Sequence, residues 1–164
     1  MIGNIVDVTS KTANWLAALL LFCMFGHILY EVILRNFFDT STFVLDEFVG
    51  YAVSGLAFLA LGESLRRGEM LSVAILETVL PRRIWAWVSV FANALAIFVG
   101  AMMVFFIGRS ALINLERGTT SSSVAEIPQV IPQAILCAGA AIFVLRAIEM
   151  TWKALGNAVS AERI

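Results

Sequence analysis

Four long apolar stretches, separated by short charged loops, occupy almost all of this 164-residue chain. A helix rises about 1.5 Å per residue, so about 20 apolar residues cross a bilayer core that is roughly 30 Å thick. Each stretch is near or above that length. They run over residues 15–34, 44–65, 84–108 and 127–148. The sequence therefore predicts a protein that works from inside a membrane.

Composition agrees with an all-α integral membrane protein that forms a single membrane domain over residues 1–164. The chain is 60% hydrophobic and 14% charged, whereas a soluble domain usually has about 25% charged residues. The apolar runs do not alternate with polar residues as the strands of an outer-membrane barrel do. We expect four transmembrane helices, at approximately residues 13–35, 44–67, 82–110 and 125–150.

Short motifs between the apolar runs predict how the helices are connected. The segment 70–80 is apolar but has only eleven residues before Pro81. Because it is too short to cross a bilayer, we expect a short interfacial helix between the second and third transmembrane helices. Ser123 and Glu126 have the spacing of a capping box, which predicts a helix start near 125. Pro132, inside that helix, is expected to bend it.

Basic residues predict the orientation of the chain. With four crossings, the N-terminus, the central loop and the C-terminal end share one side of the membrane. That side has eight of the eleven basic residues. Because cationic loops stay in the cytoplasm, both termini are expected there. The four tryptophans are assigned to the same side, where the indole ring suits the headgroup layer.

Few residues are candidates for chemistry, and we expect neither an enzyme nor a cofactor site. The net charge of −1 shows no electrostatic footprint for nucleic acid. The single histidine, His27, cannot provide the paired axial ligands of a haem-binding anchor, which disfavours the anchor of a redox complex. Cys23 and Cys137 match no metal or redox spacing and are interpreted as small apolar residues near mid-depth. A contact between them remains open.

His27, Glu31 and Arg35 follow one another at intervals of four on one helix face. Polar residues inside a membrane helix are costly and often functional, so a proton relay is one interpretation. It belongs to an alternative function, a small homodimeric proton-coupled exporter that uses Glu31. In the other interpretation Glu31 pairs with Arg35 while His27 bonds a neighbouring helix.

Charged residues at both ends of the second helix are candidates for structural or partner contacts. Asp46 and Glu47 open this helix, where they either complement its dipole or contact a partner. Arg66 and Arg67 close it and are expected to form an interfacial salt-bridge cluster with Glu63.

Small residues predict close helix packing. Ala92, Ala96 and Gly100 repeat at a spacing of four on the third helix. In lipid, such a face lets another helix approach closely. We expect a packed bundle that docks on another membrane protein.

Several motifs, in this order and spacing, resemble those of the small membrane subunit (the Q, or DctQ-type, component) of tripartite ATP-independent periplasmic (TRAP) transporters. The resemblance covers nearly the full length of the chain. Its motifs are Arg-Asn-Phe-Phe at 35–38, the acidic pair at 46–47, Leu-Gly-Glu-Ser-Leu-Arg-Arg-Gly at 61–68, Leu-Pro at 80–81 and Glu-Ile-Pro…Ile-Pro at 126–132.

The resemblance implies a non-catalytic scaffold subunit in the bacterial inner membrane. Its partners would be membrane lipid, a large membrane subunit that holds the sodium and substrate sites, and a periplasmic substrate-binding protein. The complex would be a sodium-coupled, binding-protein-dependent secondary transporter for an organic acid, either a carboxylate or a sialic-acid-like substrate. By analogy, the acidic outer face of this chain would help to receive the binding protein.

Overall fold

A computed structural model describes residues 2–67 and 81–161 of the chain. Within these ranges the regular secondary structure consists of α-helices joined by irregular connections. Each helix is long and apolar enough to cross a membrane. The short interfacial helix expected over 70–80 lies outside the described residues. The helices are α1 (Ile2–Phe37), α2 (Leu45–Arg67), α4 (Arg82–Arg117) and α5 (Val130–Ala161).

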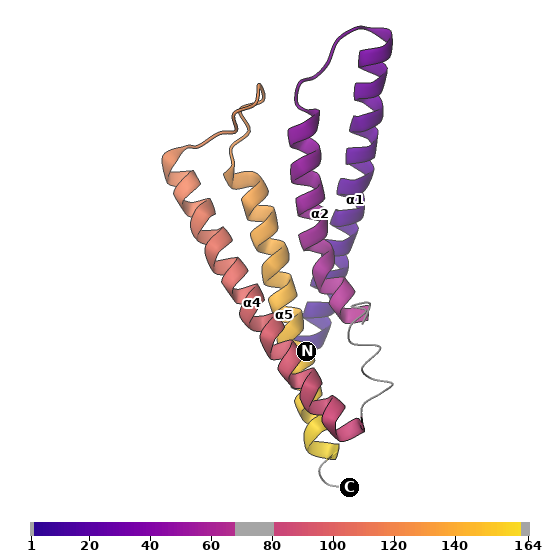
Figure 1. Ribbon diagram of the computed structural model, residues 1–164, viewed down its shortest axis with the longest axis vertical. Coiled ribbons are helices and arrows are strands. Elements are labelled where there is room, and N and C mark those ends of the chain that lie inside the picture. The colour runs from indigo at the N-terminus through magenta and orange to yellow at the C-terminus, as the bar shows by residue number, and fades with distance from the viewer. Residues whose placement is uncertain (1, 68–80, 162–164) are drawn as a thin grey trace.

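The start of α1 and the end of α5 lie toward the same end of the bundle, which we call the terminal end (Figure 1). The connections 38–44 and 118–129 lie at the opposite end, which we call the loop end (Figure 1). Consecutive helices therefore run in opposite directions. This arrangement is the one that four successive crossings produce.

Helix α1 begins at Ile2, well before the expected start at residue 13. Its first turns are polar, but they present a stripe to the bundle at a helical spacing. The stripe consists of Val6, Ser10, Ala13 and Ala17, which are all buried. Hydropathy does not reveal this extension, because only one face of its first turns is buried and the other positions are largely polar. Trp15 consequently lies within α1 rather than at its end.

Helices α4 and α5 also differ from the expected ranges. α4 continues past residue 110 to Arg117 and is ended by Gly118, whose φ of 59° is left-handed and favours glycine. α5 begins at Val130 and not at 125. The predicted capping box is therefore wrong, because Glu126 itself has a left-handed φ of 45° and the chain is not yet helical there. Pro132 falls in the first turn of α5, where its missing N–H costs no helical hydrogen bond.

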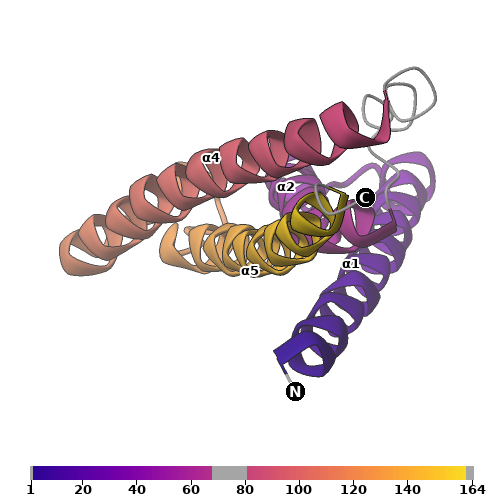
Figure 2. The same ribbon diagram turned by 90° about the horizontal axis from the view of Figure 1, so that it is seen from below.

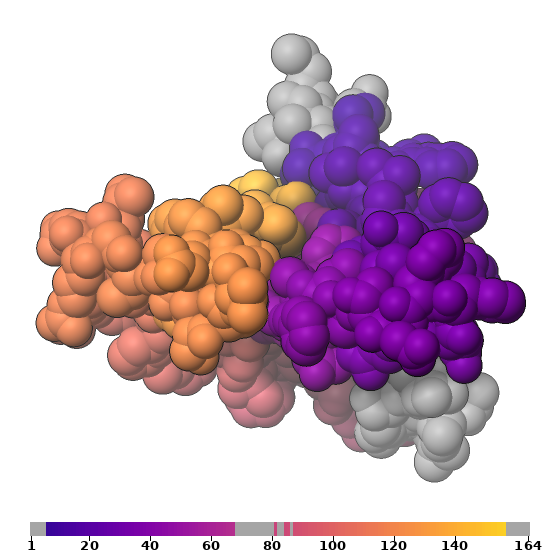
Figure 3. Space-filling view, turned by 90° about the horizontal axis from the view of Figure 1, so that it is seen from above, coloured from indigo at the N-terminus to yellow at the C-terminus, as the bar shows by residue number. Residues whose placement is uncertain are grey.

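Helix α5 is the centre of the bundle, since it contacts α1, α2 and α4. α2 also contacts α1. Among the described residues, α4 contacts α5 and no other helix. Views from both ends place α4 on one side of α5 and the α1–α2 pair on the other (Figures 2 and 3). The bundle is therefore one-sided, with α4 held along a single face.

Glycines set how closely α5 approaches its neighbours. A Cβ added at Gly139 would lie 2.7 Å from the backbone carbon of Phe58 in α2. A Cβ added at Gly100 of α4 would lie 2.6 Å from Val144 in α5. Close approach of this kind gains van der Waals contact, which is the main attraction between helices in lipid.

We expect Gly139→Ala to lower the free energy of unfolding by about 1–3 kcal/mol, because the added Cβ forces α5 away from the α2 backbone. Thermal unfolding of the purified protein in detergent measures the effect. Gly26→Ala is the matched control, since a Cβ at Gly26 meets nothing within 4 Å. Equal loss of stability in both variants would contradict the close-packing argument.

Candidate functional site

The connection between α1 and α2 folds over the buried carboxylate of Glu31, which is only 1% exposed. Glu31 accepts a hydrogen bond from Arg35 Nε at 2.9 Å and one from the backbone N–H of Thr42 at 3.1 Å. The hydroxyl of Thr42 donates to the same carboxylate at 2.6 Å, and the hydroxyl of Ser41 donates to it as well. Glu31 thus pairs with Arg35 and also fixes the connection that leads into α2.

The ring of His27 packs on that of Phe48 in α2, with centroids 5.0 Å apart. Its Nε2 is buried without a hydrogen-bond partner, and no hydrogen bond joins His27 to Glu31 or to any other described residue. The contact with the neighbouring helix is therefore between rings, where the sequence had led us to expect a hydrogen bond. The reason is that α2 presents an aromatic side chain at this level.

Glu47, in the first turn of α2, links that helix to the connection 118–129. It accepts a hydrogen bond from the Tyr51 hydroxyl at 2.7 Å and another from the Ser123 hydroxyl. We call the Glu47–Ser123 contact the loop-end latch. Asp46, beside it, is exposed to solvent. The two residues of the acidic pair therefore differ in role, since only Glu47 ties elements together.

A hollow of about 180 Å³ lies close to the loop-end latch, between the α1–α2 pair and α5. Its walls carry Leu20 from α1, Phe48 and Tyr51 from α2, and Ile131 and Ile135 from α5. The lining is apolar apart from the tyrosine hydroxyl, which is turned to Glu47. Such a lining suits hydrocarbon and offers few groups for binding an ion.

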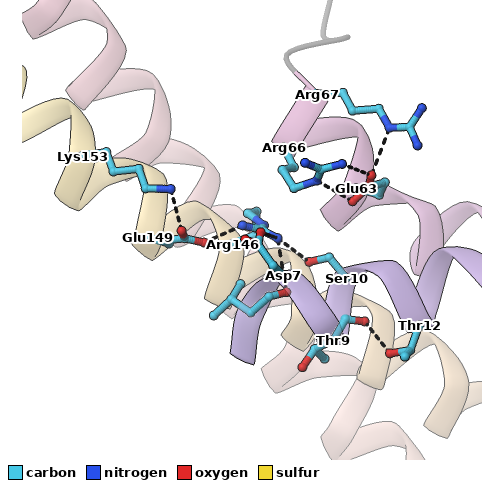
Figure 4. Close-up of polar contacts among 11 residues, drawn as sticks. Asp7, Thr9, Ser10, Thr12, Glu63, Arg66, Arg67, Arg146, Glu149 and Lys153 are labelled. Carbon is cyan, nitrogen blue, oxygen red and sulfur yellow. Dashed lines mark hydrogen bonds and ion pairs between the residues drawn. The ribbon is translucent and has the colours of Figure 1, made fainter. Parts of the chain in front are cut away.

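At the terminal end, Arg146 of α5 is 1% exposed and binds α1 directly (Figure 4). One of its terminal nitrogens lies 2.7 Å from the Asp7 carboxylate and 3.1 Å from the Ser10 hydroxyl. The other donates to Glu149 at 2.5 Å, and Glu149 also pairs with Lys153 at 2.6 Å. We call Asp7, Ser10, Arg146, Glu149 and Lys153 the Arg146 network.

The Arg146 network was not predicted from the sequence, in which Arg146 counted only among the basic residues that set the orientation of the chain. Two local signals pointed to it. Arg146 stands inside an apolar run with Glu149 three residues later, and Asp7 and Ser10 have the same spacing in the polar lead. Nothing in the sequence indicated that these two pairs of residues contact each other in the fold.

A second ionic cluster closes α2 at the terminal end (Figure 4). The buried carboxylate of Glu63 accepts two hydrogen bonds from Arg66, at 2.8 and 2.5 Å, and one from Arg67 at 3.0 Å. Both arginines lie in the last turn, where cations complement the helix dipole.

The small residues predicted on α4 have different environments. Gly100 is buried against α5, Ala96 is half-buried and Ala92 is exposed. Only part of the stripe therefore faces α5. Cys137 of α5 faces α4, with its sulfur 3.8 Å from the Val104 carbonyl oxygen, while Cys23 is exposed on α1.

Within the described ranges, no group of three or more His, Cys, Asp or Glu side chains is placed to hold a metal ion. Among the charged side chains whose burial the structure describes, Glu31, Glu63 and Arg146 are buried, and each is bonded to other residues of the chain. The polar clusters found here hold helices and connections in place.

A family model described as "Tripartite ATP-independent periplasmic transporters, DctQ component" matches residues 24–157. The chain belongs to the DctQ family. It is the small membrane component of a TRAP transporter and a multi-pass membrane protein. Comparison with curated proteins and with solved structures gives no match. The matched range includes Glu31, Glu47, Glu63 and Arg146 but not Asp7 or Ser10, so the α1 half of the Arg146 network lies before it.

We expect Arg146→Met to lower the free energy of unfolding of this DctQ protein by about 2–3 kcal/mol, because it removes the charged hydrogen bonds that join α5 to Asp7 and Ser10 of α1 and leaves Glu149 with Lys153 alone. Lys153→Met is the control. Its ammonium group is largely exposed, so its loss should cost no more than about 1 kcal/mol. Unfolding in detergent measures both, and similar losses for the two variants would show that the buried network does not join α1 to α5.

We expect Ser123→Ala to open the loop-end latch and to make amide exchange in residues 118–129 several-fold faster, with a small effect on global unfolding. Hydrogen–deuterium exchange with mass spectrometry measures this. Ser122→Ala is a neighbouring control, because Ser122 is exposed. Unchanged exchange in Ser123→Ala would mean that the latch does not order the connection.

Proposed function

We propose that this DctQ protein is a non-catalytic scaffold that packs on the large membrane subunit of its transporter. One observation carries the proposal: the charged side chains that the structure describes as buried are each bonded to other residues of this chain. A residue that carries an ion or proton across a membrane has to bind and release its cargo. Glu31, Glu63 and Arg146 are instead occupied by partners that hold the fold.

Glu31 distinguishes the scaffold from the alternative exporter. An exporter would need Glu31 to take up and release protons during its cycle. In the structure its carboxylate accepts four hydrogen bonds, from Arg35, Ser41 and Thr42. Proton uptake would cost these contacts and release the connection into α2. This arrangement favours a structural role.

The partners and energetics that we propose follow the family resemblance. The large subunit would contain the sodium and substrate sites, and the transported substrate would be an organic acid, a carboxylate or a sialic-acid-like molecule. The small subunit would be embedded in the bacterial inner membrane with lipid around its apolar surface. A periplasmic binding protein would deliver the substrate to the complex.

The distribution of charge supports an orientation with the termini in the cytoplasm. Seven basic residues lie at the terminal end, namely Lys11, Arg66, Arg67, Arg82, Arg83, Arg146 and Lys153. The loop end has Arg35 and Arg117 together with the acidic Asp46, Glu47 and Glu126. Since cationic segments are retained in the cytoplasm, the loop end would face the periplasm. Its exposed Asp46 would favour encounter with a basic patch of the binding protein.

Co-purification and reconstitution test the proposal. A tag on this chain should capture a co-expressed large subunit, and vesicles that contain only this chain should take up neither succinate nor sialic acid. In vesicles with the full complex and its binding protein, Glu31→Gln should retain sodium-driven uptake while lowering the melting temperature of the complex. Uptake or export by this chain alone, abolished in Glu31→Gln, would establish the exporter instead.

A further inference from the structure

Arg109 is an exposed cation on the apolar outer face of α4. Its neighbours at helical spacing are Phe105, Phe106 and Leu112, which are 62%, 57% and 62% exposed. Met102, one further turn toward the terminal end, is exposed as well. The guanidinium group therefore stands in a surface that is otherwise suited to hydrocarbon or to another apolar helix.

Contacts across α5 show how far along the bundle Arg109 lies. Its neighbour Gly108 approaches Cys137 of α5, since a Cβ at Gly108 would be 3.6 Å from the cysteine sulfur. Two residues further along α5, Gly139 packs on the backbone of Phe58, near the middle of α2. Arg109 is thus level with the central part of α2, a helix whose whole length is apolar enough to span a membrane.

The geometry of α4 makes it difficult for the Arg109 side chain to extend its guanidinium group to the polar residues at the loop end. Arg109 lies eight residues before Arg117, the last residue of α4, which corresponds to about 12 Å along the helix. Side chains on a helix tilt toward its N-terminus, which for α4 is the terminal end. Extension toward the polar loops would therefore oppose this tilt.

Arg109 has no acidic partner among the described residues, in contrast to four other arginines of the chain. Arg35, Arg66, Arg67 and Arg146 each form an ion pair with a carboxylate of this chain. For Arg109 there is no ion pair with any residue in the described ranges, and α4 contacts only α5 among the described helices. Charges within membrane spans are costly unless they are paired or face a protein interior.

We propose that the face of α4 formed by Met102, Phe105, Arg109 and Leu112 is the surface on which the large membrane subunit packs, with a carboxylate of that subunit paired to Arg109. The inference rests on the scaffold role proposed above and specifies its docking face. Charge complementarity identifies the occupant, because an unpaired guanidinium in an apolar face calls for an acidic partner at the same depth. The exposed aromatic and aliphatic side chains around it would exclude water from the pair.

The central experiment compares variants of the intact complex. The large subunit and a tagged form of this chain are co-expressed, and the amount of large subunit recovered per tagged chain is measured after detergent extraction. Arg109→Gln should lower this recovery roughly tenfold, because the partner carboxylate is left buried and unpaired. Arg109→Lys, which keeps the charge, should restore part of it. Arg117→Gln is the control, since Arg117 also has no ion pair in the described ranges but lies at the helix end.

A photo-crosslinking measurement keeps the test independent of folding defects. Benzoylphenylalanine placed at Leu112, with Arg109 unchanged, should crosslink to the large subunit, and mass spectrometry of the product should locate an acidic residue nearby. Replacing that residue by its amide should reproduce the Arg109→Gln defect.

The remaining outcomes are distinct. If the wild-type chain captures no large subunit, the scaffold function itself is wrong. If capture is normal in Arg109→Gln and Leu112 crosslinks only to lipid, the scaffold function stands and the docking face is overturned, with Arg109 serving a lipid phosphate.

Discussion

The close approach of α5 to the backbone of α2 at Gly139 is the contact on which the rest of the bundle depends. α5 is the helix that touches the three others, and Gly139 lies near the middle of its contact with α2. With α5 held this close to α2, the side chain of Arg146, two turns further along α5, forms an ion pair with Asp7 of α1. In lipid, where apolar burial gives little attraction between helices, such packing and the polar bonds that it permits supply the specificity of the fold.

Burial of charge at both ends of the bundle follows one rule. Glu31 at the loop end and Arg146 at the terminal end are each removed from solvent, and each is surrounded by several partners of opposite charge or hydrogen-bonding capacity. A buried charge is tolerated only under such conditions. The chain therefore uses its few deep polar groups to fix connections and helix pairs. That use is compatible with a DctQ subunit that supports transport carried out by another chain.

The asymmetry of the bundle has a functional meaning in this context. Among the described helices α4 contacts α5 alone, through glycine and polar contacts along one side, and it presents a wide apolar face elsewhere. A helix held in this way has surface available for a second protein. Arg109 on that surface pairs with no described residue, which is the basis of the docking face that we propose.

Local patterns in the sequence were sufficient for the parts of the fold that local physics controls. Hydropathy and length located four spans, and spacings of three and four residues along a helix anticipated Glu31 with Arg35 and Glu63 with Arg66 and Arg67. The family resemblance rested on motifs of the same short range. Helix ends were less well placed, because the capping-box letters at Ser123 and Glu126 serve a connection in which Ser123 bonds to Glu47.

Only the tertiary structure decided which helix is central and which polar residues meet. Ser10 and Arg146 are separated by 136 residues, and Glu47 and Ser123 by 76, so no local spacing could relate them. These pairs form only because of the order of the helices around α5. They also depend on the glycines, which set where along the bundle the helices approach each other closely. Sequence determined which segments enter the membrane, since that choice depends on each segment's own transfer energy. The arrangement of helices determined what their charges do, since the energy of a charge depends on its neighbours.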